Sequence, residues 1–275
     1  INPRERNMMK TKIFALMMSA LLGLSTLAGC SQTEESSGDL LAQIQERGEI
    51  VIATEGTWAP WTYHDENDEL VGYDIEVAKA IAEKLDVTAT FVEGEWDGLL
   101  SGVESGRYDI MANGVEIDDA RREKYDFSVP YAYNRIVIIV RGDNEDIQSF
   151  EDLEGKTTAN TLQSTYATMA EQYGATVTAV DDLNQTIQLL LSDRIDATLN
   201  SDVTANDYMT AQPDADIKIA AVSEDATQVA IPMRKGEETA TLRAAIDEAL
   251  NELSEEGVLT ELSEKYFGID ISQAE

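Results

Sequence analysis

The sequence predicts an α/β fold made of two similar lobes, and three observations lead to this prediction. From Ile50 onward, short apolar runs alternate with segments of helical periodicity, a pattern typical of parallel sheets flanked by helices. A short motif occurs twice, once in each half of the chain. About 235 residues follow the N-terminal segments, which is enough for one large or two modest α/β domains.

The main elements follow from periodicity. Residues 50–53 (Ile-Val-Ile-Ala) predict a buried strand. The segment 73–85 places its apolar side chains on one helical face and its charged side chains elsewhere, as expected for an amphipathic helix packed on a sheet. Residues 133–141 form an apolar run that predicts a further strand, and the segments 237–253 and 258–266 predict two closing helices.

The repeated motif spans residues 105–113 and 191–200. Each copy closes a predicted helix and opens a short strand that ends in asparagine. Ligand crevices of open α/β sheets lie beyond the carboxyl ends of the strands. Asn113 and Asn200 are therefore expected on facing walls of a crevice, unless the similarity of two short segments is a coincidence.

We expect the chain to cross between the lobes where polar residues interrupt the alternation of apolar runs and helical segments. We place the first crossing near 131–135 and the return crossing near 222–228. The first lobe then comprises residues 39–132 and 227–275, and the second lobe comprises residues 133–226.

The N-terminal residues read as an export signal. Four basic side chains precede an apolar stretch, residues 13–24, that is too short to span a bilayer as a helix. Small residues then lead to Cys30, as in the lipobox at which bacterial lipoproteins are cleaved and acylated. We therefore predict a signal peptide over 1–29 and a lipid anchor at Cys30; the alternative is an incidental thiol in a discarded signal.

A polar tether of residues 30–38 should follow, because its small side chains cannot bury apolar surface. Residues 1–29 hold four basic and one acidic side chain, so their removal changes the formal net charge from −33 to −36. A field of this sign repels nucleic acid and anionic lipid surfaces. We expect an exported monomer, held at the cell membrane by its lipid on the outer side, that binds no nucleic acid.

The sequence offers few residues for a catalytic triad or a metal site. Cys30 is the single cysteine and His64 the single histidine, and they lie far apart in the sequence. No nucleophile triad can be built around that histidine, and no metal cluster is apparent. We therefore expect no catalytic residue, no metal and no cofactor.

Motifs along most of the chain resemble those of extracellular amino-acid-binding proteins of bacterial ABC importers, solute-binding family three. Residues 72–82 (Gly-Tyr-Asp-Ile-Glu-Val-Ala-Lys-Ala-Ile-Ala) carry the signature, supported by the segments 55–61, 96–100 and 121–128. The resemblance extends over residues 49–267. It implies a periplasmic-binding-protein-like (type II) fold with two hinge strands, which captures a polar amino acid between the lobes and delivers it to a membrane permease. Cystine-binding members look most similar.

The resemblance also implies the ligand contacts. Arg121 aligns with the family's carboxylate-binding arginine, and Ser164 with a serine or threonine of the opposite lobe that begins a helix, where backbone N–H groups favour an anion. Trp58 and Trp96 align with aromatic positions that line the ligand's side chain. The remaining expected contacts surround these, namely Asn113, Gly114, Val115, Gln163 and Thr165.

For the ligand ammonium, the resemblance does not point to a single acidic residue. Many members place an aspartate where this chain has Ser201, followed here by Asp202. Glu55 and Glu116 are the alternatives, and each of these acids could instead be a solvated surface residue. Two other functions stay open: an enzyme on the same scaffold, such as a dehydratase that uses Glu55 or Glu116, and a free-standing amino-acid sensor.

Overall fold

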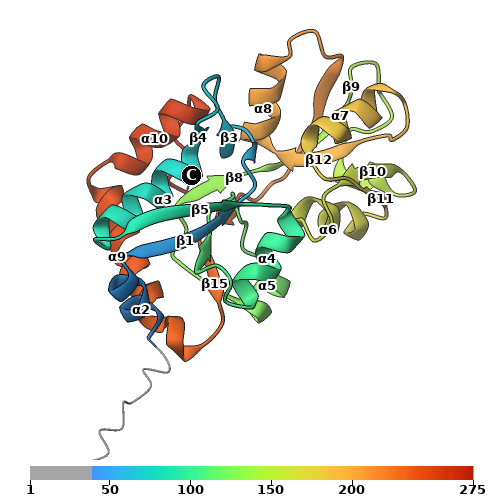
Figure 1. The fold of residues 1–275 in the computed structure, drawn as a ribbon. Helices are drawn as coiled ribbons and strands as arrows, with labels where there is room; N and C mark the ends of the chain where they lie inside the picture. Colours follow the sequence, from blue (N-terminus) through green and yellow to red (C-terminus); the bar gives the residue numbers. More distant parts are fainter. Residues whose placement is uncertain (1–38, 275) are drawn as a thin grey trace, which may run out of the picture. The chain divides into compact units, whose positions relative to one another are not determined.

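A computed structural model describes residues 39–274, which belong to one compact unit (Figure 1). The predicted signal peptide, the tether and Cys30 lie outside the described residues. Over 39–274 none of the helices combines the length and the apolar character needed to traverse a bilayer.

The first lobe is built on a mixed five-stranded sheet. Its order is β5 (Thr88–Glu93), β1 (Glu49–Thr54), β6 (Ile110–Met111), β15 (Pro232–Arg234) and β7 (Tyr125–Phe127). β1 runs parallel to β5 and β6, whereas β15 is antiparallel to β6 and β7. The C-terminal part of the chain thus supplies a strand in the interior of the sheet.

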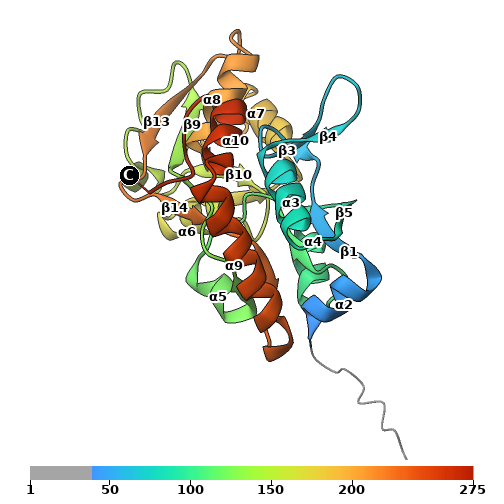
Figure 2. The ribbon, with the colours of Figure 1, turned by 90° about the vertical axis from the view of Figure 1, so that its left-hand side faces the viewer.

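Alternation along β1 distributes its side chains over two cores, as expected for a strand buried on both faces. Ile50 and Ile52 enter one cluster, and Ala53 enters the other. Four helices supply the first cluster: α2 (Leu40–Arg47), α3 (Tyr73–Lys84), α9 (Ala240–Glu255) and α10 (Val258–Phe267). α3, α9 and α10 lie beside one another (Figure 2). The second cluster includes α4 (Trp96–Glu104), and α5 (Asp119–Lys124) leads into β7.

The second lobe has an antiparallel core and a parallel edge. β9 (Ile136–Arg141) lies between β12 (Thr198–Ser201) and β13 (Ile217–Val222), antiparallel to both, while β10 (Thr157–Asn160) runs parallel to β11 (Thr176–Ala179). A parallel bridge between Thr158 and Ala197 connects the two parts.

β9 organises the core of the second lobe. Its alternate side chains enter two clusters, one shared with the short helix η1 (Phe150–Leu153) and α6 (Thr165–Gln172), the other with α7 (Leu183–Leu191) and α8 (Asp202–Ala211). All its residues but the last are buried. Such a run of apolar residues is expected of a strand covered on both faces.

The chain passes between the lobes through β8 (Ala132–Asn134) and β14 (Thr227–Val229), which pair antiparallel. The first lobe also carries a small sheet of β2 (Thr57–Trp58), β3 (Thr62–His64) and β4 (Leu70–Val71).

Three details differ from the sequence-based expectations. The sheets are mixed rather than parallel, because β15 and β9 each enter after a crossing and not after a helix that would return them in parallel. The expected strand 133–141 is divided into β8 and β9, because the backbone N–H of Arg135 donates to the carboxylate of Asp202 (3.2 Å) at that point. The first closing helix begins with a short 3-10 turn, η2 (Glu237–Thr239).

Candidate functional site

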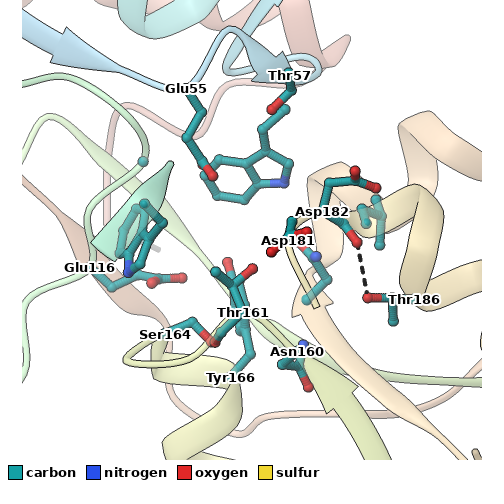
Figure 3. Close-up of a pocket in the computed structure, with 15 residues that line it drawn as sticks. Glu55, Thr57, Glu116, Asn160, Thr161, Ser164, Tyr166, Asp181, Asp182 and Thr186 are labelled. Carbon is teal, nitrogen blue, oxygen red and sulfur yellow. Dashed lines mark hydrogen bonds between the residues drawn. The ribbon is translucent and has the colours of Figure 1, made fainter. Parts of the chain in front are cut away.

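Residues from both lobes line a cavity of about 590 Å³, open solvent at its mouth included (Figure 3). The first lobe contributes Glu55, Thr57, Trp58, Trp96, Gly114 and Glu116. The second lobe contributes Asn160, Thr161, Ser164, Tyr166, Asp181, Asp182, Leu183, Thr186 and Asn200.

Strand ends place most of the polar side chains in this cavity. Glu55 follows β1, Gly114 and Glu116 follow β6, Asn160 ends β10, and Asp181 lies just after β11. These strands belong to two different sheets, yet all end toward the same cavity. The cavity thus occupies the position in which α/β sheets bind ligands, beyond the carboxyl ends of their strands.

Arg121 is a buried arginine, 6% exposed, beside the cavity. Its Nη1 donates to the carbonyl of Glu116 (2.7 Å) and its Nη2 to the carbonyl of Gln163 (3.1 Å), so it connects the two lobes. Its Nε lies 3.4 Å from a carboxylate oxygen of Asp118, and its guanidinium carbon lies 5.2 Å from the centre of the Trp96 ring. Guanidinium carries five N–H donors, so one N–H on Nη1 and one on Nη2 have no hydrogen-bond partner among residues 39–274.

Glu116 joins the hinge to the second lobe. Its backbone bridges to Val229 at the end of β14, and its Oε2 accepts a hydrogen bond from the hydroxyl of Thr165 (2.8 Å) at the first turn of α6. The same oxygen lies 3.8 Å from Nη1 of Arg121. The carboxylate is therefore anchored on one oxygen, in surroundings where the side chain is 4% exposed.

Ser164 caps α6. Its hydroxyl accepts from the backbone N–H of Ala167 (3.1 Å) and donates to the carbonyl of Thr161 (2.6 Å). This cap leaves the N–H groups of Thr165 and Tyr166 without intrahelical acceptors, as at any helix start. The start of α6 is therefore suited to an anion.

Two tryptophans form the apolar part of the cavity. Trp58 stacks on the fully buried Trp61 with ring centres 5.6 Å apart, and Trp96 covers Arg121. Gly114 lies against both Trp58 and Trp61 with a φ of +56°, and a Cβ there would come within 2.5 Å of the Trp58 ring. A glycine at this position lets the two indoles approach the backbone.

Glu55 is held by Asn113. Nδ2 of Asn113 donates to Oε2 of Glu55 (2.6 Å), and the Glu55 backbone N–H donates to Oδ1 of Asn113 (2.7 Å). Burial raises the pKa of Glu55 to about 7, with the nearby charges of Glu95 and Asp182 acting in the same direction and the bond from Asn113 opposing them.

The cavity has polar atoms without hydrogen-bond partners. Trp96 Nε1, Glu116 Oε1, Asn160 Oδ1 and Tyr166 Oη are all buried, and none has a partner among the described residues. All four residues line the cavity. A buried polar group without a partner costs about 1–3 kcal/mol, so four of them around one cavity indicate a polar occupant.

The structure brings together only part of the predicted site. Six of the expected residues line the cavity: Glu55, Trp58, Trp96, Gly114, Glu116 and Ser164. Arg121, Asn113 and Thr165 do not line the cavity but hydrogen-bond to Glu116 or Glu55, which do, and Gln163 accepts a hydrogen bond from Arg121. Val115 is fully buried in the core of the first lobe.

Ser201 and Asp202 do not line the cavity. Ser201 is the N-cap of α8, bonded to Thr204. The Asp202 carboxylate accepts from the N–H groups of Arg135 and Val203 near the crossing between the lobes. Local capping therefore accounts for both side chains.

Sequence reasoning did not assign a ligand role to Thr57, Asn160, Thr161, Tyr166, Asp181, Asp182, Leu183 or Thr186, all of which line the cavity. Asp182 could be recognised in the sequence only as a helix N-cap, which it is. Asn160 and Asp181 are brought together by the parallel pairing of β10 with β11, which the sequence alone does not reveal.

Asp74 supports the cavity from the core. It is fully buried, and its carboxylate accepts hydrogen bonds from the Gly114 backbone N–H and from the hydroxyl of Tyr131 (2.7 Å). Burial raises the pKa of Asp74 to about 7, while these two hydrogen bonds oppose the shift. Gly114 lines the cavity and Tyr131 precedes β8, so one carboxyl group holds both.

These raised pKa values predict that the protein becomes less stable as the pH rises from 5 to 7.5. Over this window the folded state retains protons on Asp74 and Glu55 that the unfolded chain has lost, so the free energy of unfolding falls with pH. We expect a loss of about 2–4 kcal/mol, measured by urea denaturation.

The variant Asp74→Asn should reduce this pH dependence, because its amide cannot titrate and can still pair with Gly114 and Tyr131. The exposed Asp146→Asn, which removes the same charge, should leave the slope as in the parent protein. Equal stability at pH 5 and 7.5, or greater stability at 7.5, would contradict the assignment.

The potential metal ligands among the described residues are His64 and the acidic side chains. Over 39–274 no group of three or more His, Cys, Asp or Glu side chains is arranged to hold a metal ion. His64 lies in β3, where its ring contacts Glu93 and the carbonyl of Asp68, and it is not among the residues that line the cavity.

Comparisons with known proteins agree with this geometry. Residues 50–269 match the model of the bacterial extracellular solute-binding proteins, family 3. The chain belongs to this family. The match confirms the family resemblance and the type II fold that the motifs predicted.

Individual relatives cover nearly the whole chain. The L-cystine-binding protein TcyA of Bacillus subtilis is 36% identical over 273 residues, 96% of this chain and 100% of the relative. An ancestral arginine-binding protein bound to arginine superposes with a TM-score of 0.75 at 35% identity, covering 81% of this chain and 99% of that one.

The unliganded, open L-cystine solute receptor of Neisseria gonorrhoeae has a TM-score of 0.58 at 37% identity, with 86% of this chain and 100% of that one covered. This chain is thus more similar in structure to the arginine-bound protein than to the open receptor, although its sequence is slightly closer to the latter. The contacts of Arg121 and Glu116 with the second lobe are consistent with lobes that have come together.

Proposed function

We propose that this chain captures a polar α-amino acid between its lobes, with cystine among the candidates, and delivers it to the permease of an ABC importer. The observation that carries the proposal is the cavity itself, which is lined from two opposed lobes by buried polar atoms that have no hydrogen-bond partner among residues 39–274. The cystine-binding relative and the arginine-bound structural neighbour support an amino acid as the occupant.

The ligand carboxylate would bind to Arg121 and the start of α6. The two N–H groups of Arg121 without protein partners can donate to its oxygens, and guanidinium matches carboxylate geometry. The N–H groups of Thr165 and Tyr166 would contribute from the second lobe, at the helix start that Ser164 caps. This division couples binding to closure, because only the closed form gathers all the donors.

The ligand ammonium would bind to Glu116. Oε1 of Glu116 is a buried carboxylate oxygen without a partner among the described residues, and Oε2 is fixed by Thr165. Glu55 is a second acceptor across the cavity. Asp202 is a weaker candidate, because backbone N–H groups occupy its carboxylate. Trp58 and Trp96 would cover the aliphatic part of the ligand.

The proposed signal peptide and lipid anchor would place the protein at the cell surface. Lipid attached at Cys30 would hold a monomer to the outer side of the membrane, and residues 30–38 would let it reach the permease.

Binding without turnover is the expected behaviour. The histidine does not line the cavity, and the acids that do have binding roles in this proposal. We therefore expect no product from prephenate or arogenate, measured by chromatography after incubation with the protein. Formation of either dehydration product would favour the enzyme on the same scaffold.

Purified residues 39–275 test the function directly. Mass spectrometry of small molecules released on denaturation should identify an amino acid, and calorimetry of the ligand-free protein should give a submillimolar Kd with a stoichiometry near one. A panel of the common amino acids and cystine without any binding would contradict the proposal.

A further inference from the structure

The charged side chains that line the cavity are all acidic. They are Glu55, Glu116, Asp181 and Asp182, and over the described part of the chain the lining contains no lysine, arginine or histidine. Arg121 lies next to the cavity, but Glu116 and Asp118 are both within 4 Å of it. One amino acid with a single ammonium and a single carboxylate would leave most of this negative charge unbalanced.

The acids occupy opposite sides of the cavity. Glu55 and Glu116 belong to the first lobe, and Asp181 and Asp182 to the turn between β11 and α7 in the second (Figure 3). Glu116 and Arg121 are the proposed binding groups for the ligand's amino-acid end. The two aspartates therefore face the part of the ligand that lies away from that end.

On the side of the cavity lined by Asp181 and Asp182, Asn160 offers a further hydrogen-bond acceptor. Its Nδ2 donates to the carbonyl of Leu199 (2.8 Å) and to the hydroxyl of Thr198 (3.3 Å), which fixes the orientation of the amide. Its Oδ1 is consequently a buried acceptor without a partner among the described residues, on a side chain that is 4% exposed. The carbonyl of the same residue accepts from the N–H of Val180, adjacent to Asp181.

Asp182 is another fixed acceptor that lines the cavity. Its Oδ1 accepts from the backbone N–H of Gln185 (2.9 Å) and its Oδ2 from Nε2 of Gln185 (3.1 Å). A carboxylate has about four lone-pair sites, so each oxygen retains acceptor capacity. Asp181 is exposed at the rim, where it can meet a group entering from solvent.

We propose that Asp181, Asp182 and Asn160 form a subsite for a second cationic group, so that the preferred ligand is a basic α-amino acid with a side-chain ammonium or guanidinium. This proposal rests on the proposed function and specifies its ligand. An ammonium or guanidinium group carries only donors, which suits a subsite of an amide oxygen without a partner among residues 39–274 and two carboxylates.

Cystine fits this subsite less well. Its second half brings an ammonium together with a carboxylate, and the lining residues offer that carboxylate no cation. A side chain that ends in ammonium or guanidinium brings the positive charge without the additional anion. The mutual repulsion of Glu55 and Asp182, one cause of the raised pKa of Glu55, would also be relieved by a cation bound near both.

Matched pairs of ligands test the proposal by calorimetry at low ionic strength. Arginine should bind at least tenfold more tightly than citrulline, and lysine at least tenfold more tightly than norleucine, because each pair differs mainly in the terminal charge. Added salt should reduce the advantage.

The double variant D181N/D182N should lower the affinity for arginine at least tenfold and change that for citrulline less than threefold. Asparagine at position 182 retains the N-cap of α7. The double variant D146N/D214N removes the same charge from exposed positions that do not line the cavity and should leave both affinities unchanged.

Equal binding of arginine and citrulline by the parent protein, or undiminished selectivity in D181N/D182N, would overturn the subsite. Tight binding of cystine or glutamine with weak binding of arginine would also overturn it, while leaving the proposed function intact. A parent protein that binds no amino acid would instead contradict the proposed function.

Discussion

Replacing Arg121 by lysine should weaken the binding of every α-amino acid ligand about 100-fold, a loss of about 3 kcal/mol. Arg121 is the group that we propose for the ligand carboxylate, and its other donors hold the carbonyls of Glu116 and Gln163 and face Asp118. Lysine retains the charge beside Glu116 but cannot make all these bonds from one ammonium. The loss should therefore be independent of the ligand's side chain.

Calorimetry with a ligand identified for the parent protein checks this prediction. Arg122 is the matched control, because it follows Arg121 on α5 and its side chain is exposed. Arg122→Lys should bind as the parent does. If Arg121→Lys retained the parent affinity within threefold, the carboxylate would have to be bound elsewhere.

Trp61→Ala should lower the free energy of unfolding by about 3–5 kcal/mol. Trp61 is fully buried and lies at the centre of an aromatic cluster, with ring centres 5.6 Å from Trp58, 5.8 Å from Tyr73 and 4.9 Å from Phe267. Its Nε1 also donates to the hydroxyl of Thr204 in the second lobe (3.2 Å). The substitution would thus leave a cavity and remove the hydrogen bond to Thr204, whose hydroxyl would keep the bond from Ser201.

Urea denaturation of the ligand-free protein measures this effect. Trp61→Phe, which keeps most of the volume, should cost less than the alanine variant and report chiefly on the bond to Thr204. Tyr173→Ala removes an aromatic ring that is 36% exposed and should cost under about 1 kcal/mol. A Trp61→Ala protein as stable as Tyr173→Ala would show that the cluster contributes little.

The fold was largely predictable because its elements are locally encoded. β1, α3 and the closing helices follow from apolar periodicity, and the family motifs predicted the class of fold. The antiparallel placement of β9 and β15 was not predictable from periodicity, since a fully buried strand has the same pattern in either direction. The division between β8 and β9 depends on Asp202, which is distant in the sequence.

Cavity residues that lie within a family motif could be predicted from the sequence. Residues that only strand pairing brings together could not. Glu55, Trp58 and Trp96 lie in motif segments, and the repeated motif directed attention to Asn113 and Asn200. Asn113 holds Glu55, and Asn200 lines the cavity. Asp181 and Asn160 come together only through the pairing of β10 with β11, and in the sequence the pair Asp181-Asp182 is indistinguishable from an ordinary helix start.

The position of β15 has a consequence for the order in which the chain acquires its structure. The strands and helices from β9 to β13 form one continuous stretch, so that all of their strand pairs are present in the chain once residue 222 has been made. The sheet of the first lobe cannot be completed then, because β7 pairs with β15, more than 100 residues later in the chain. During synthesis or translocation, the lobe begun first must be finished last, and it keeps a gap between β6 and β7 until the C-terminal segment arrives.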